Sequence, residues 1–101
     1  MILTVRYSHV RDLVSYYANK ISDQRVLEIL ESGLKSEDDA RHFSHFIWKM
    51  IDSMAEDREN GIEVLGAKDN TSMVADVSYE IDVLMSDCGY SQIWEDISDQ
   101  A

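Results

Sequence analysis

The sequence of 101 residues contains no proline, one cysteine and four scattered glycines. A single cysteine excludes a disulfide scaffold and a cysteine-based zinc module. The absence of proline excludes a proline-rich linker, and glycines this far apart form no phosphate-binding loop. One domain of ordinary apolar content, with 45% hydrophobic residues over 1–101, is therefore expected.

Long apolar runs are also missing. No stretch approaches the 18 or so consecutive apolar residues that a membrane span requires, so we expect none. Arg6 and His9 interrupt the first apolar residues before they reach the length of a signal peptide. The lone Cys88 fits a reducing compartment. Together these features predict a cytoplasmic protein.

Basic residues are few, and most of them lie in the first half of the chain. The chain has nine Lys and Arg against 20 Asp and Glu, a formal net charge of −11. Residues 1–50 carry seven bases and seven acids, whereas residues 51–101 carry two bases and 13 acids. Such asymmetry indicates an electrostatic partner, although charge that only keeps a small protein dispersed is the alternative. A surface this negative repels nucleic acid, so we expect no direct nucleic-acid binding.

Apolar residues recur at helical spacing along most of the chain. Ser36 is a predicted helix start, because three acids follow it where the positive helix end favours carboxylates. Ser22 or Asp23 similarly starts an earlier helix that ends near Gly33. We therefore predict a mainly α-helical domain of four to five short helices. The clearest segments are 8–20, 23–33, 36–59 and 91–98.

Three segments are ambiguous between helix and strand. Residues 1–7 and 62–66 are short and apolar, and are predicted to form at most a minor two-stranded element. Residues 73–85 fit both a helical stripe and a strand alternation. We favour a helix there, because Asn70 or Ser72 would start it, Gly89 would stop it, and 13 residues make a long strand.

The histidines and the cysteine, which are the side chains most suited to metal binding or catalysis, do not form a recognisable reactive motif. His42 and His45 lie three residues apart, one turn after Asp38, which is the spacing of two or three metal ligands without a fourth. We interpret both histidines as boundary residues and expect neither a metal nor another cofactor. Cys88 continues an apolar stripe and is predicted to be a packed thiol. No nucleophile motif is present, so we do not expect an enzyme.

Acidic residues form rows in the second half. Asp52, Glu56, Glu59 and Glu63 follow one another at i, i+4, i+7 and i+11. Successive members of such a row lie roughly 4.5–6 Å apart along a helix axis, the same order as neighbouring phosphates along a nucleic-acid strand. The alternative is a solvated helix face without a partner.

A second row depends on the structure of residues 73–85. A helix places Asp76, Glu80 and Asp87 on one face, whereas a strand places Asp76, Glu80 and Asp82 on one face. Further along, Trp94 precedes two acids and is our candidate for an aromatic anchor inside an acidic rim. The predicted partner-binding residues are Asp52, Glu56, Glu59, Glu63, Asp76, Glu80, Asp82, Asp87, Trp94, Glu95 and Asp96.

These features predict a small acidic inhibitory binding protein that blocks a basic, nucleic-acid-binding surface of another protein. Phage inhibitors of CRISPR or restriction complexes, some of them DNA mimics, and immunity proteins of nuclease toxins have this size and charge, but no motif assigns the chain to either group. The expected partner is a nuclease, a CRISPR or restriction component, or a toxin. The alternative is a structural or adaptor homo-oligomer that uses the apolar stripes of the neutral first half as its interface.

Overall fold

The structure, a computed structural model, describes residues 8–61 and 71–101, which form five helices and no strand. The predicted mainly α-helical fold is thus confirmed, and the disputed segment 73–85 lies within a helix. Residues 1–7 and 62–66, the predicted minor strands, lie outside the described residues. The helices are α1 (Ser8–Lys20), α2 (Gln24–Ser32), α3 (Glu37–Glu59), α4 (Thr71–Asp87) and α5 (Ser91–Gln100).

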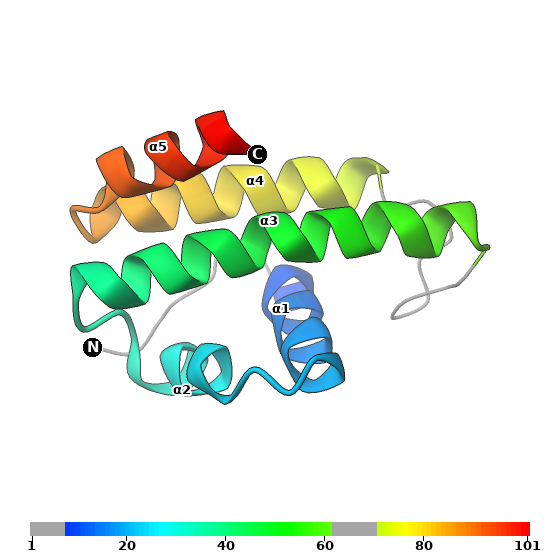
Figure 1. Cartoon of the computed structure of the whole chain (residues 1–101), viewed down its shortest axis with the longest axis horizontal. Coiled ribbons are helices and arrows are strands. Elements are labelled where there is room, and N and C mark those ends of the chain that lie inside the picture. Colours follow the sequence, from blue (N-terminus) through cyan, green and yellow to red (C-terminus); the bar gives the residue numbers. More distant parts are fainter. Residues whose placement is uncertain (1–7, 62–70) are drawn as a thin grey trace.

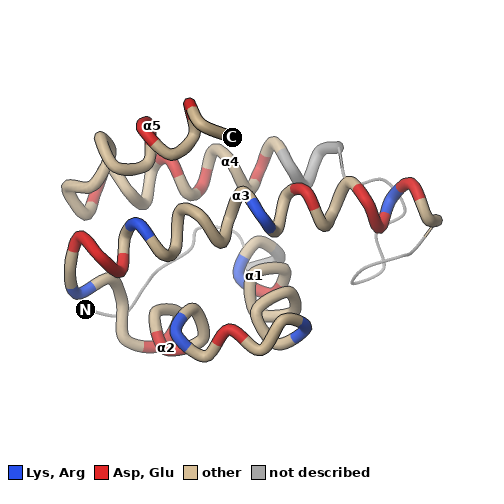
Figure 2. Tube along the Cα trace, viewed as in Figure 1, with Lys and Arg blue, Asp and Glu red and all other residues tan. Residues whose placement is uncertain are grey.

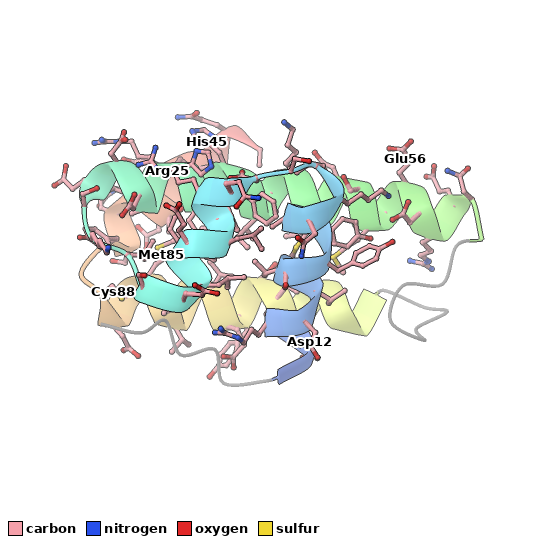
Figure 3. All side chains as sticks on the ribbon, turned by 90° about the horizontal axis from the view of Figure 1, so that it is seen from below. Asp12, Arg25, His45, Glu56, Met85 and Cys88 are labelled. Carbon is pink, nitrogen blue, oxygen red and sulfur yellow. The ribbon has the colours of Figure 1, made fainter. Side chains whose placement is uncertain are left out.

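Two long helices, α3 and α4, run antiparallel along the length of the molecule (Figure 1). The α1–α2 pair packs on one side of them and α5 on the other (Figures 1 and 3). α5 contacts both long helices, and α1 contacts both as well. Among the described helices, none combines the length and apolar content that crossing a membrane requires.

Local signals in the sequence set the starts of α2 and α3. The Asp23 carboxylate accepts a hydrogen bond from the Val26 backbone N–H at 3.0 Å, which caps α2. The Ser36 hydroxyl accepts one from the Asp39 N–H at 3.2 Å, which caps α3. Each cap satisfies a backbone donor that the helix itself leaves unpaired. α2 ends at Gly33, whose φ of +86° is one that residues with a side chain rarely adopt.

The core draws side chains from all five helices. On α4, Val77, Ile81 and Met85 are fully buried at four-residue intervals. This spacing explains why the helix prevails over the strand in this segment, because strand alternation would put Tyr79 on the buried side with them. Tyr79 is instead 54% exposed. Trp94 from α5 belongs to the same core.

Candidate protein-binding surface

Several acids around the start of α3 are engaged by a base. The Arg25 guanidinium on α2 donates to Asp38 and Asp39 at the start of α3, both at 2.8 Å. Asp39 also accepts from the Lys35 backbone N–H at 3.0 Å. The hydrogen bonds from Arg25 and Lys35 lower the pKa of the Asp39 carboxyl. This cluster fixes α2 against the first turn of α3.

The two histidines with the spacing of metal ligands lie in different surroundings. His42 Nε2 lies 2.9 Å and 3.1 Å from the two oxygens of Asp23, the residue that caps α2. Asp38 is paired with Arg25, and His45 is exposed. Within residues 8–61 and 71–101, no three metal-ligating side chains converge. The contact between His42 and Asp23 therefore joins α2 to α3.

One acid from the second half of the chain is buried and paired. Asp57 on α3 is 6% exposed and accepts a hydrogen bond of 2.8 Å from the Tyr17 hydroxyl on α1. Lys20 Nζ lies 3.6 Å from the same oxygen. Burial, together with the nearby Asp57 carboxylate, raises the pKa of Tyr17 well above its usual range. Asp57 therefore stabilises the contact between α1 and α3 and is not part of a binding surface.

α4 and α5 have a different charge pattern. Residues 71–101 contain seven Asp and Glu and no Lys or Arg. Figure 2 shows acids and no bases along the described parts of both helices. Five of these acids are exposed and form no ion pair within the described part of the chain. We call these residues the α4–α5 acidic surface: Asp82, Asp87, Glu95, Asp96 and Asp99.

This surface includes one residue that the sequence analysis missed. Asp99 lies three and four positions after Asp96 and Glu95, which places all three on one side of α5. The spacing of Asp99 is visible in the sequence, but the predicted acidic rim around Trp94 included only Glu95 and Asp96. Asp96 also accepts a hydrogen bond of 2.9 Å from Gln92 on the preceding turn.

A second set of exposed acids lies on the last turns of α3. Asp52, Glu56 and Glu59 are exposed at the predicted spacing, and Figure 3 shows Glu56 pointing away from the other helices. We call these three residues the α3 acidic row. α3 ends at Glu59, and the fourth predicted member, Glu63, lies outside the described residues.

Two predicted partner-binding acids of α4 are not exposed: Glu80 is buried and Asp76 is half-buried. Glu80 is 4% exposed because it lies beside Val77 and Ile81, on the side of α4 that faces the domain. Asp76, one turn earlier, is half-buried. The predicted row of Asp76, Glu80 and Asp87 is thus not a continuous exposed face. A partner docking on the native surface reaches Asp87 but not Glu80.

Trp94 is a core residue and not an exposed anchor. It is 5% exposed and stacks on Trp48 of α3, with ring centroids 5.6 Å apart and planes 16° apart. Trp48 Nε1 donates to the Ser98 hydroxyl on α5 at 3.0 Å. Consecutive helical residues point about 100° apart, so the acids that follow Trp94 in sequence do not surround it in space. Both indoles instead fix α5 on α3.

The apolar stripes of the first half are mostly buried inside the domain. Ile21 is 48% exposed and Leu27 is only partly buried, whereas the other stripe residues are at most 8% exposed and pack into the common core. The homo-oligomer alternative is therefore left with Ile21 and Leu27 as its apolar contacts. The buried stripe residues are Val10, Leu13, Val14, Tyr17, Val26, Leu30 and Leu34.

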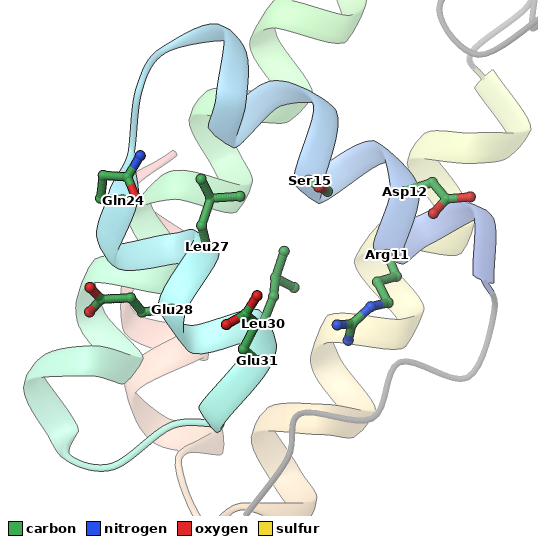
Figure 4. Close-up of a pocket in the computed structure, with 8 residues that line it drawn as sticks. All are labelled: Arg11, Asp12, Ser15, Gln24, Leu27, Glu28, Leu30 and Glu31. Atoms are coloured by element: carbon green, nitrogen blue, oxygen red, sulfur yellow. The ribbon is translucent and has the colours of Figure 1, made fainter.

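A shallow pocket lies between α1 and α2, and its residues gave no signal in the sequence because they come from two helices (Figure 4). Arg11 extends from α1 toward α2, while Leu27 and Leu30 supply apolar wall. Glu28 and Glu31 add acids at the α2 edge, so the pocket carries both signs of charge. This mixture does not favour an ionic ligand of one sign.

Cys88 packs against the core at the end of α4, as its place in the apolar stripe predicted. Burial raises the pKa of its thiol, and the charge of Asp87 adds to the effect. A raised pKa keeps the thiol protonated, which opposes nucleophilic reactivity.

Comparison with protein-family models, curated proteins and solved structures finds no match for this chain. Its function is therefore inferred from its surface.

Proposed function

We propose that the protein is a small inhibitory binding protein that blocks a basic, nucleic-acid-binding surface of a partner protein. The partner is a nuclease, a CRISPR or restriction component, or a toxin. One observation supports this most directly: five carboxylates of the α4–α5 acidic surface are exposed without a neutralising base on their own helices.

Acids without a neutralising base slightly destabilise the helices that carry them. Asp87 ends α4, where the negative helix end disfavours a carboxylate, and Glu95 and Asp99 are like charges at i, i+4. Each effect is small, and core packing compensates for it. Binding to a cationic groove converts the same charges into favourable contacts.

Carboxylates suit a groove that evolved for phosphates. Arginine and lysine pair with both groups through charge-assisted hydrogen bonds. The acids also raise the association rate with a basic partner through long-range attraction. The α3 acidic row adds three more exposed carboxylates, with members roughly 4.5–6 Å apart along the helix axis.

Affinity capture with matched variants tests the proposal. The α4–α5 triple variant carries Asp82→Asn, Asp87→Asn and Glu95→Gln. The α1–α2 triple variant carries Asp12→Asn, Glu28→Gln and Glu31→Gln, and so removes the same charge from exposed sites in the neutral half. We expect the wild type and the α1–α2 triple variant to retain one basic partner that the α4–α5 triple variant loses.

The captured partner then allows a test of inhibition. Its binding to a labelled nucleic acid is measured by fluorescence anisotropy while the acidic protein is added. The proposal predicts competitive displacement by the wild type and much weaker displacement by the α4–α5 triple variant. A partner that binds nucleic acid equally well in the presence of the wild type contradicts it.

A further inference from the structure

The outward face of α4 carries an aromatic side chain with no role in the core. Tyr79 is 54% exposed, the most exposed large hydrophobic residue in the described part of the chain. Ala75, Asp82 and Ser86 share this face with it at i−4, i+3 and i+7, and all three are exposed. Two of these neighbours are small, so the helix does not cover the ring.

Asp82 is placed to act together with this ring. Helical side chains lean toward the amino end of their helix, so the Asp82 side chain leans toward the turn that holds Tyr79. Asp82 forms no ion pair within the described residues. The face therefore presents an uncovered aromatic ring beside an acid of the α4–α5 acidic surface.

We infer that Tyr79 and Asp82 together bind an arginine side chain of the basic partner. This inference rests on the proposed function and names the contact at its centre. A guanidinium is planar, so it stacks on an aromatic ring while its N–H groups donate to a carboxylate. A lysine ammonium is compact and strongly hydrated, and gains less from the ring. Tyr79 takes the anchor role that the sequence analysis assigned to Trp94.

Charge identifies the occupant of this face as a basic segment and not a second copy of the chain. Asp82 and Asp87 are exposed on α4, and residues 71–101 supply no Lys or Arg to meet them. Two α4 faces brought together would place like charges side by side. An arginine-bearing loop or helix brings opposite charge to the same place.

Two labelled peptides test the inference on the intact protein. One alternates arginine with glycine, the other alternates lysine with glycine, and both have equal length and charge. Affinities are measured by fluorescence anisotropy at low ionic strength. We expect the arginine peptide to bind about threefold to fivefold more tightly than the lysine peptide, from the strength of an exposed cation–π contact. Tyr79→Ala should abolish this preference, and Tyr79→Phe, which keeps the ring, should preserve it.

Matched variants in the neutral half provide the control. Tyr16 on α1 is 38% exposed and Asp12 is an exposed acid on the same helix. Tyr16→Ala and Asp12→Asn should leave the arginine preference unchanged, whereas Asp82→Asn should reduce it. Circular dichroism of each variant is the control that its helices remain folded.

The outcomes separate this inference from the proposed function. Equal binding of both peptides that the α4–α5 triple variant weakens would overturn the arginine site and leave the proposed function standing. No binding of either peptide would count against both. Loss of the preference in Tyr16→Ala, or a dimer of the wild type that Tyr79→Ala dissociates on a sizing column, would also overturn the inference.

Discussion

Acids around the start of α3 and acids along α4 and α5 have different surroundings, although the residues are chemically the same. Around α2 and the first turn of α3, Arg25 engages Asp38 and Asp39, and His42 engages Asp23. Along α4 and α5, five exposed acids have no base on either helix. Asp12, Glu28 and Glu31 are also exposed, but bases lie on the same helices, so the α4–α5 acids differ in having no base nearby in sequence.

The two regions also differ in what holds them to the rest of the molecule. α2 is joined to α3 partly by polar contacts of Asp23 and Arg25 at its amino end. α4 and α5 are held by apolar burial, through Ile81, Met85 and Trp94. Changes to the charge of α4–α5 should therefore alter binding and leave the fold intact, whereas changes to its apolar side should do the opposite.

The largest expected effect comes from the apolar side of α5. Trp94→Ala removes a buried indole that stacks on Trp48, so we expect a loss of about 3–5 kcal/mol in the free energy of unfolding. Urea denaturation measures it. Trp94→Phe should lose less, because it refills part of the space. Unchanged stability together with lost partner binding would return Trp94 to the role of an exposed anchor.

A smaller effect is expected at the buried acid of α3. Asp57→Ala leaves the buried Tyr17 hydroxyl without its acceptor, which should cost about 1–3 kcal/mol of unfolding free energy. Adding Tyr17→Phe removes the stranded donor, so the double variant should be less destabilised than the sum of the two single variants. Strict additivity in urea denaturation would show that the two groups do not stabilise each other.

The stability that the hydrogen bonds to Asp39 provide should depend on pH. Hydrogen bonds from Arg25 and Lys35 lower the pKa of Asp39 in the folded state, from an ordinary value of 3.8. Their contribution to stability is therefore complete above that ordinary value and is lost as the pH falls through the lowered one. Thermal unfolding from pH 6 to pH 2 should show this decline. Arg25→Gln should make it shallower, and an identical decline would contradict the pairing.

The smallest effect is expected on the acidic side of α4 and α5. The α4–α5 triple variant should change the unfolding free energy by no more than about 0.5 kcal/mol, because its three sites are exposed and make no ion pair within residues 8–61 and 71–101. Relief of the carboxylate at the end of α4 favours a slight gain. A loss greater than about 1 kcal/mol would show that these acids are structural after all.

The sequence predicted the helices well because their signals are local. Ser36 and Asp23 cap α3 and α2 as expected, and the apolar spacing matched the buried sides. The segment around Val77 was ambiguous because both periodicities fit it, and only packing against the other helices decides between them. A strand would have placed Tyr79 on the same side as Val77, whereas the helix places it on the outward face.

The predicted binding residues were less reliable because exposure depends on where other helices pack. Nothing in the spacing of Asp76, Glu80 and Asp87 shows how far the neighbouring helices cover that side of α4. Trp94 was identifiable in part, since Ile97 at i+3 shares its face and marks that face as buried. Asp82, Asp87 and Glu95 were predicted and are exposed.

The central claim, that the α4–α5 acidic surface binds a cationic partner, is tested most directly by measuring affinity against salt. The captured partner is purified and its dissociation constant is determined from about 50 to 300 mM NaCl, across which screening of exposed charges rises steeply. We predict that wild-type affinity falls with salt and that the α4–α5 triple variant binds weakly with a flatter dependence. The same affinity and salt dependence in both proteins would contradict the claim.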